Sequence, residues 1–135
     1  LTQRYQEFLD KDAQVFVVMQ STPDSIRKSL ADADVPFEII CDPTYEIYQG
    51  LDIGVWGEPG SKPDRSAMDP AAMEAFAKLR EEITALGFTH GEYEGIEEQL
   101  PALFITDSDA TVTYALYPDN IKVRMPSVDE ALALL

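Results

Sequence analysis

QLPALFITDSDATVTYALY, residues 99–117, decides the fold of this 135-residue chain. Pro101 directly precedes an apolar segment of strand length, residues 102–105, and residues 107–109 form a short polar turn. Residues 111–117 then alternate as a second strand would. Proline cannot donate to a sheet ladder, so at this position it indicates a sharp turn into a strand, which a cis peptide bond would provide. The stretch predicts a β-hairpin that begins immediately after the proline.

The sequence upstream of this hairpin predicts strands separated by helices. Residues 14–19 are a continuous apolar run, typical of a strand covered on both sides, and residues 37–41 predict a second strand. Thr22-Pro23 and Asp42-Pro43 each combine an N-cap with a proline at the first helical position. They predict a helix over Ile26, Leu30 and Ala33 and a short helix over residues 45–49 that Gly50 ends. The chain opens with a helical face made by Leu1, Tyr5, Phe8 and Leu9.

Residues 54–87 differ in composition from the rest and predict an inserted loop and helix. The loop, GVWGEPGSKPDRSAMD, is rich in Gly, Pro, Ser and charge, and it is long enough for a lid or an insertion. Asp69-Pro70 predicts the start of a helix that ends at Gly87. The apolar residues at helical spacing predict one buried face; they are Met73, Phe76, Leu79, Ile83 and Leu86.

The order of elements predicts a single α/β domain over residues 1–135. Strands separated by helices favour a mainly parallel sheet, here with the hairpin at its end, in an α/β sandwich. A capping box at Ser127 and Glu130 predicts a final helix through Leu135.

Composition excludes several classes of partner. The net charge of −15 disfavours nucleic acid and anionic membrane surfaces, and it fits either solubility or adaptation to high salt. The sequence contains no apolar run long enough for a transmembrane helix and no visible signal peptide. Cys41 is the only cysteine, which rules out an internal disulfide and fits the reducing cytoplasm weakly. We expect a cytoplasmic protein.

Four stretches together resemble the peroxiredoxin-like proteins of the alkyl hydroperoxide reductase and thiol-specific antioxidant (AhpC/TSA) group. They are LTQRYQEFLDKDAQVFVV, VPFEIICDPTYEIYQGLDIG, EYEGIEEQLPALFITDSDATVTYALYPDNI and PSVDEALALL. The Asp42-Pro43 and Leu100-Pro101 steps weigh most, and the resemblance covers most of the chain outside residues 54–86. It implies a thioredoxin-like α/β sandwich with a mixed sheet.

The resemblance also implies a segment upstream of Leu1. In that family a strand, a loop and a helix start bearing the peroxidatic cysteine precede the stretch that matches LTQRYQEF, and Leu1 would lie roughly one turn beyond the cysteine. A helix N-terminus lowers the pKa of a thiol and so favours the thiolate. The upstream strand would lie between the strands matching residues 15–19 and 102–105. Without it, two apolar edges would face a gap, unless the sheet closes differently or a partner chain fills the slot.

The resemblance assigns Leu100 and Pro101 to the wall of a substrate groove, with Pro101 as the cis-proline that packs against the active-site thiol. The alternative for Pro101 is a proline that simply starts the strand. For Cys41, which ends a predicted strand, the first interpretation is a buried apolar side chain. The alternative is a resolving thiol that pairs with an upstream cysteine.

The remaining candidate residues have simpler interpretations. His90 is the only histidine and cannot by itself make a structural zinc site. Glu92, Glu94, Glu97 and Glu98 are expected to form a solvated acidic loop, although paired carboxylates could serve glycoside chemistry or a divalent cation. Residues 107–109 lack the glycine and final glutamate of a calcium loop. Trp56 could either line a groove or anchor its loop. We expect no metal and no cofactor.

The resemblance and the candidate residues support two alternative functions. In the first, the parent protein is a thiol-dependent peroxidase or oxidoreductase that uses the upstream cysteine and a thioredoxin-type dithiol reductant, and the present chain alone is inactive. In the second, the chain is a non-catalytic thioredoxin-like binding module. An open sheet edge would favour association, such as a homodimer.

Overall fold

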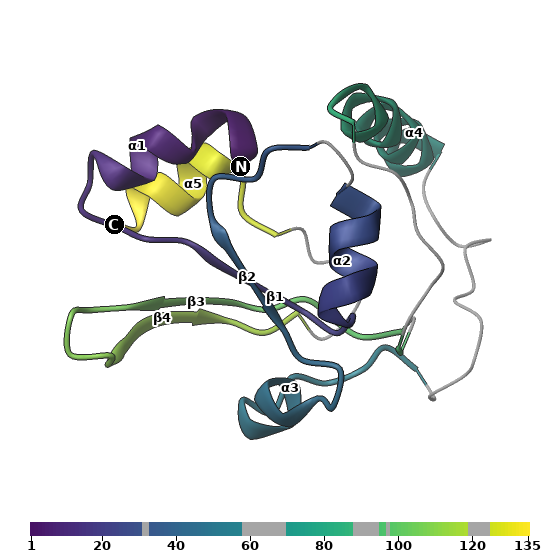
Figure 1. The fold of residues 1–135 in the computed structure, drawn as a ribbon. Coiled ribbons are helices and arrows are strands. Elements are labelled where there is room, and N and C mark those ends of the chain that lie inside the picture. The colour runs from purple at the N-terminus through teal and green to yellow at the C-terminus, as the bar shows by residue number, and fades with distance from the viewer. Residues whose placement is uncertain (31–32, 58–69, 88–94, 97, 119–124) are drawn as a thin grey trace.

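The computed structural model describes residues 1–30, 33–57, 70–87, 95–96, 98–118 and 125–135. Helices and strands alternate along the chain as the sequence predicted (Figure 1). In chain order the elements are η1 (Thr2–Arg4), α1 (Tyr5–Leu9), β1 (Phe16–Met19), α2 (Pro23–Leu30), β2 (Glu38–Cys41), α3 (Glu46–Gly50), α4 (Pro70–Ala85), β3 (Leu103–Thr106), β4 (Val112–Leu116) and α5 (Val128–Ala133). The α/β class is confirmed, and the arrangement is compatible with a thioredoxin-like fold.

The strands form two separate pairs. β1 and β2 are parallel, with Val17 opposite Ile39, whereas β3 and β4 form the predicted antiparallel hairpin, with Leu103 opposite Leu116. Within the described residues no ladder joins β1 to β3. The mixed sheet expected from the sequence is therefore present as two halves. The division falls between the two strands where the family resemblance places one further strand.

The separation of the sheets leaves β1 less covered than its sequence suggested. Val17 and Val18 are half-buried, but Phe16 is 53% exposed and Met19 is 38% exposed. The expectation of a strand covered on both sides is wrong at both ends of β1. Strand side chains project from the two faces of a sheet, so the exposure of Phe16 and Met19 shows that these two side chains lack a covering surface in the described residues.

Helices α1 and α5 lie side by side (Figure 1) and contribute two of the buried apolar side chains, Phe8 and Leu132. A charged contact joins α5 to the end of η1, directly before α1, because Nη2 of Arg4 donates to Oδ1 of Asp129 at 2.7 Å. The predicted capping box is present: Ser127 accepts from the backbone N–H of Glu130, and the Glu130 side chain accepts from that of Ser127. The C-terminal helix is thus held at its first turn by both local and tertiary contacts.

The Arg4 guanidinium also forms a two-pronged pair with Glu7, with N–O distances of 2.6 and 2.7 Å. Its hydrogen bonds to Glu7 first, and then to Asp129, raise the pKa of Arg4. In return, the hydrogen bond from Arg4 lowers the pKa of Glu7 below its usual value. Because the groups are exposed, solvent screens the interaction and it orients the helix start more than it stabilises the fold.

Helix α4 differs from its prediction. The apolar stripe was expected to be buried, yet Met73 is 48% exposed, Ile83 is 42% exposed and Leu86 is 43% exposed. The expected burial is wrong at these three positions. Helical spacing groups apolar residues on one face, but burial of that face needs an opposing surface. Among the described elements no other helix or strand packs extensively against α4.

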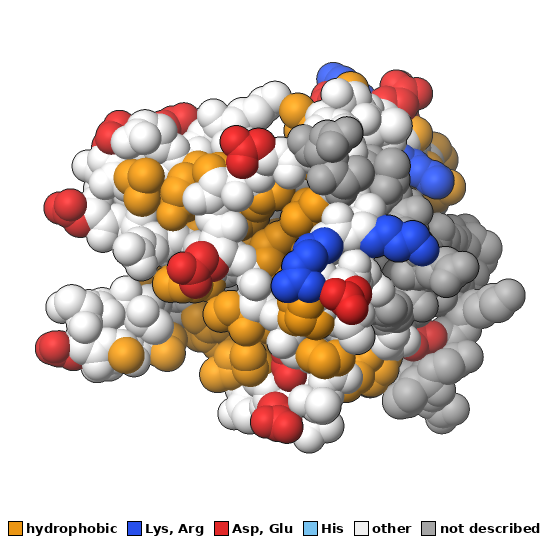
Figure 2. All heavy atoms as spheres, in the orientation of Figure 1, with side chains coloured by type: hydrophobic (Ala, Val, Ile, Leu, Met, Phe, Trp, Pro, Cys, Tyr) orange, Lys and Arg blue, Asp and Glu red, His pale blue; other side chains and the backbone are white. Residues whose placement is uncertain are grey.

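Apolar side chains gather over the middle of the face shown in Figure 2, while several acidic side chains lie around its rim. The most deeply buried apolar residues of the described chain come from four different segments, and they are Phe8, Ile26, Leu100 and Leu132. In the described ranges, the helices are all too short or too polar to traverse a lipid bilayer. Leu100 belongs to the segment that the sequence singled out, which places that segment in the core.

Candidate functional site

The segment that leads into β3 is held by a short antiparallel contact with residues 54–56. Val55 and Gln99 form a bridge. The backbone N–H of Trp56 donates to the carbonyl of Glu98 at 2.8 Å, and that of Leu100 donates to the carbonyl of Gly54 at 3.2 Å. Trp56 is half-buried, so its loop is anchored here by backbone pairing. The contact fixes the position of the predicted groove residues.

The peptide bond between Leu100 and Pro101 is trans, since the described residues include no cis peptide. The predicted cis-proline is therefore wrong, and Pro101 starts the strand segment in the alternative way that the sequence allowed. The bridge between Val55 and Gln99 supplies the reason, because it leads the chain into β3 in an extended course without a sharp reversal. Leu100 is buried with 6% exposure, whereas Pro101 is exposed.

Gln99 adds side-chain contacts to this anchor. Its amide nitrogen donates to the carbonyl of Gly54 at 2.8 Å and to that of Ile53 at 3.3 Å. Exposure alternates along the segment: Glu98 and Leu100 are buried, Gln99 is half-buried and Pro101 is exposed. Alternation of this kind is typical of extended backbone. It indicates that Glu98 and Leu100 lie on the inner side of the segment.

A second anchor holds the same segment at the end of β1. The side-chain amide of Gln20 donates to the carbonyl of Ile96 at 2.9 Å and accepts from its backbone N–H at 3.2 Å. Gly95 next to it has φ +99°, which favours glycine. A Cβ at Gly95 would overlap the hydroxyl of Tyr45 and the amide carbon of Gln20. No pattern in the sequence assigned Gln20 or Tyr45 to this site; a glycine within an acidic segment was the one local signal.

The end of β2 contributes a buried carboxylate and two tyrosines. Asp42 is 4% exposed, and its carboxylate accepts from the backbone N–H groups of Glu46, Ile47 and Tyr48 at 2.9–3.2 Å. It therefore caps α3 across an intervening turn in which Tyr45 has φ +62°. The Tyr48 hydroxyl donates to the carbonyl of Val18 at 3.1 Å and ties α3 to β1. The Asp42-Pro43 step does cap a helix, but α3 begins at Glu46 and not at the proline.

One polar group near this anchor lacks a partner: the hydroxyl oxygen of Tyr45 is buried and has no hydrogen-bond partner among the described residues. Glu98, in the segment beside it, is only 6% exposed. The expectation that Glu98 is solvated is wrong, because the bridge beside it turns its side chain inward. Its neighbours in the predicted acidic loop, Glu92, Glu94 and Glu97, lie outside the described residues.

Cys41 is a half-buried thiol in the middle of the fold and not at the start of a helix. It is the last residue of β2 and lies opposite Met19 of β1. It therefore lacks the helix N-terminus that activates a thiolate, and its interpretation as a structural side chain stays a prediction.

The other sequence candidates do not join this region. Asp107 holds the hairpin turn by accepting from the backbone N–H groups of Asp109 and Thr111. The described residues contain no group of side chains suited to a metal ion. His90 lies outside the described residues.

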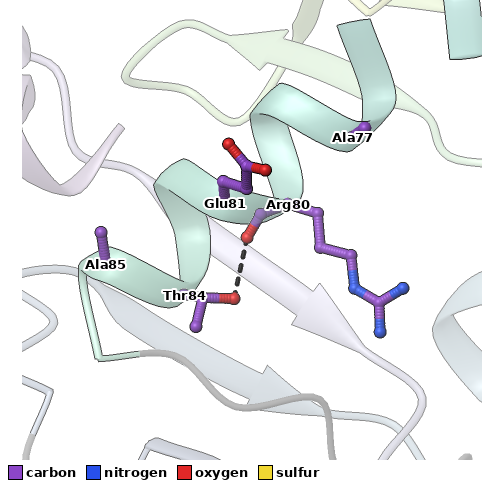
Figure 3. A pocket seen from close by; sticks show the side chains of 5 residues that line it. All are labelled: Ala77, Arg80, Glu81, Thr84 and Ala85. Atoms are coloured by element: carbon purple, nitrogen blue, oxygen red, sulfur yellow. Dashed lines mark hydrogen bonds between the residues drawn. The ribbon is translucent and has the colours of Figure 1, made fainter. Parts of the chain in front are cut away.

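Two hollows lie elsewhere on the surface. One, of about 360 Å³, is lined mainly by apolar side chains of β1, α2 and β2 together with Leu1. The other is a shallow recess along α4, shown in Figure 3, where Arg80 and Glu81 point in different directions from neighbouring positions. Thr84 donates to the backbone carbonyl of Arg80 at 2.8 Å. The side chains in this recess do not converge, so it offers no coherent binding site.

The candidate site is therefore the region where the segment 95–101 meets the carboxyl ends of β1 and β2. In open α/β folds ligands bind at the carboxyl ends of parallel strands. Among the comparisons with known proteins, no curated protein and no solved structure matches the chain. A family model described as AhpC/TSA antioxidant enzyme matches residues 1–120. The match spans α1 through the β3–β4 hairpin, and the chain belongs to the AhpC/TSA antioxidant enzyme family.

Proposed function

We propose that the parent protein is a thiol-dependent peroxidase or thiol oxidoreductase whose reacting cysteine lies upstream of Leu1. The family match over residues 1–120 carries this proposal. The segment of Leu100 and Pro101, anchored at the carboxyl ends of the parallel strands, would supply one wall of the groove. Cys41 ends a strand and does not lie at a helix N-terminus, which supports a reactive thiol elsewhere in the protein.

The arrangement of the strands supports an upstream strand as well. β1 and β3 have no ladder between them in the described chain, and unpaired strand edges are a hazard that proteins normally cover. A strand placed between them, parallel to β1, would join the two pairs into one mixed sheet in the order β2-β1-new strand-β3-β4. The helix after that strand would continue into η1 and α1 and would begin close to the groove.

The chemistry then follows from the thiolate. Its sulfur attacks the terminal oxygen of a hydroperoxide, an S–O bond forms and the O–O bond breaks. The sulfur is oxidised to sulfenic acid, and the peroxide is reduced to an alcohol once the leaving alkoxide takes up a proton. A dithiol donor of the thioredoxin type returns the sulfenic acid to the thiol and releases water, while the donor becomes a disulfide.

The test begins with the coding region upstream of Leu1. We expect a cysteine two or three residues before the helix start, and we expect the full-length protein to consume hydroperoxide with a dithiol donor. Residues 1–135 alone, and the full-length protein with that cysteine changed to serine, should show no turnover. Cys41→Ser is the matched control and should retain activity.

Absence of an upstream cysteine would contradict the enzyme and would favour a non-catalytic binding module, whose partner would use the free edge of β1 or β3. Turnover by residues 1–135 that disappeared in Cys41→Ser would also contradict the proposal, because it would assign the reaction to the strand thiol.

A further inference from the structure

The two stretches that build most of the candidate site contain no basic side chains. Residues 29–61 and 81–121 have neither lysine nor arginine, yet they hold 16 of the 25 acidic residues. The rest of the chain has nine acidic and ten basic residues and is almost neutral. The first stretch includes β2, α3 and the anchor at residues 54–56, and the second includes the groove segment, residues 95–101. The negative charge of the protein therefore belongs to the segments around the groove.

Acidic side chains lie at the end of β2, next to the groove segment. Asp42 is buried there, and its carboxylate accepts from the backbone N–H of Glu46 at 3.0 Å. Glu46 itself is exposed. The residue before it, Tyr45, places its hydroxyl where a Cβ at Gly95 would lie, so the first turn of α3 borders the groove segment.

A second exposed carboxylate follows α3. Asp52 directly precedes Ile53, and the carbonyl of Ile53 accepts from the side-chain amide of Gln99 at 3.3 Å. Because Gln99 belongs to the groove segment, Asp52 lies beside it in the fold. Two solvent-facing carboxylates, those of Glu46 and Asp52, thus border the groove.

The basic residues of the described chain lie on other elements, and two of them are already paired. Arg4 of η1 contacts two carboxylates, and Arg27 of α2 pairs with Asp24 at 2.8 Å. On the face shown in Figure 2, basic side chains lie over α2 and toward α4, whereas α3 at the lower edge shows acidic and apolar side chains. Among the described residues, the elements that border the groove carry carboxylates and no basic side chain.

We propose that the groove selects uncharged hydroperoxides and repels anionic peroxides; this rests on the proposed function. Charge of one sign creates a potential that extends into water over about 30 Å at 0.01 M salt and about 3 Å at 1 M. Such a potential lowers the local concentration of ions of the same sign and leaves uncharged molecules unaffected. The selection acts on the approach of the oxidant and not on the chemical step.

Two probes differ in charge and oxidise a thiolate in the same way. tert-Butyl hydroperoxide is uncharged, whereas peroxymonosulfate is an anion at neutral pH. With either, the thiolate sulfur attacks the terminal peroxide oxygen, the O–O bond breaks and the sulfur is oxidised to sulfenic acid. The leaving group is tert-butoxide, which takes up a proton, or sulfate, which does not.

The first experiment measures single-turnover oxidation of the full-length protein between 0.01 and 1 M sodium perchlorate. The rate constant for peroxymonosulfate should rise about 10-fold, as the potential is screened. The rate constant for tert-butyl hydroperoxide should stay constant. 2-Mercaptoethanol under the same conditions shows the salt effect that the charge of a thiolate alone produces, and the increase for the protein should exceed it.

The second experiment changes the charge at the border of the groove, in 0.1 M salt, where potentials extend about 10 Å. Glu46→Lys should raise the peroxymonosulfate rate about 2-fold, for a change of two charges at roughly 10 Å. Asp52→Asn removes one charge at a position with φ +53° and should give a smaller increase. Neither should alter the rate with tert-butyl hydroperoxide.

The matched control is Asp109→Lys, the same charge change at an exposed position of the hairpin turn. The four residues of β3 separate that turn from the groove segment, roughly 13 Å at the usual rise of a strand. Asp109→Lys should therefore change neither rate.

The outcomes separate this inference from the proposed function. If the unmodified protein reacts with neither peroxide, the proposed function fails and the charge selection fails with it. If it reacts with tert-butyl hydroperoxide, but salt raises the peroxymonosulfate rate no more than for 2-mercaptoethanol, the proposed function stands and the charge selection is overturned. Equal effects of Glu46→Lys and Asp109→Lys, or a reaction with peroxymonosulfate alone, would also overturn it.

Discussion

Gly95 is a position where a single added methyl group would disturb the packing of the groove segment against the ends of β1 and β2. Its φ of +99° lies in a region that side-chain-bearing residues rarely adopt, and a Cβ there would overlap the Tyr45 hydroxyl and the Gln20 amide. The conformational cost of alanine is about 1–2 kcal/mol, and forcing extra volume into a packed place costs about 1–3 kcal/mol. Gly95→Ala should therefore lower the free energy of unfolding by between about 2 and 5 kcal/mol.

Two other glycines separate these contributions. Gly87 has φ +87° but open space around a Cβ, so Gly87→Ala should show the conformational cost alone, about 1–2 kcal/mol. Gly54 has open space and no positive φ, so Gly54→Ala should stay within about 0.5 kcal/mol of the unmodified protein. Urea unfolding followed by circular dichroism measures all three.

A double variant identifies the clashing partner. Tyr45→Phe removes the hydroxyl that a Cβ at Gly95 would meet, so Gly95→Ala should cost less in that background than alone. Coupling between neighbouring residues of this kind is typically about 0.5–3 kcal/mol. Two results would contradict the packing of the segment 95–101 against the end of β2. In one, Gly95→Ala lowers the free energy of unfolding no more than Gly87→Ala does. In the other, Gly95→Ala lowers it by the same amount with Phe as with Tyr at position 45.

Three further substitutions test other contacts. Asp42→Ala removes the acceptor of three backbone N–H groups at the start of α3 and should cost about 2 kcal/mol in urea unfolding; an unchanged midpoint would show that α3 needs no cap. Leu100→Ala should cost about 2–5 kcal/mol because the side chain is buried, and a loss as small as that of a surface substitution would place it outside the core. The folded-state pKa of Glu7 is lowered, so its pairing with Arg4 stabilises the fold above the unfolded pKa of the carboxyl and is lost as the pH falls through the folded value. Glu7→Gln should therefore lower the free energy of unfolding slightly at neutral pH and leave it unchanged in acid. An equal decrease at both pH values would contradict the pairing of Glu7 with Arg4.

The features that the sequence predicted correctly are those that local chemistry determines. The capping box at Ser127 and the turn at Asp107 depend on residues a few positions apart, and the hairpin after Pro101 depends on alternation and a turn. Each has a short-range physical cause. Residues adjacent in the chain carry enough information to specify it.

The features that the sequence did not predict depend on segments far apart in the chain. The trans peptide before Pro101 follows from pairing with residues 54–56, and the burial of Glu98 follows from the same bridge. The Gln20 contact with Ile96 joins residues 76 positions apart. A stripe at helical spacing indicated which side of α4 is apolar but could not supply a surface to cover it.

The most direct test of the central claim is the site of oxidation. Full-length protein is treated with one equivalent of hydroperoxide in the presence of dimedone, which traps sulfenic acid, and the adduct is located by peptide mass spectrometry. We expect an adduct on a cysteine upstream of Leu1 and none on Cys41. An adduct on Cys41, or no adduct while the hydroperoxide is consumed, would show that the reacting thiol is not the upstream cysteine.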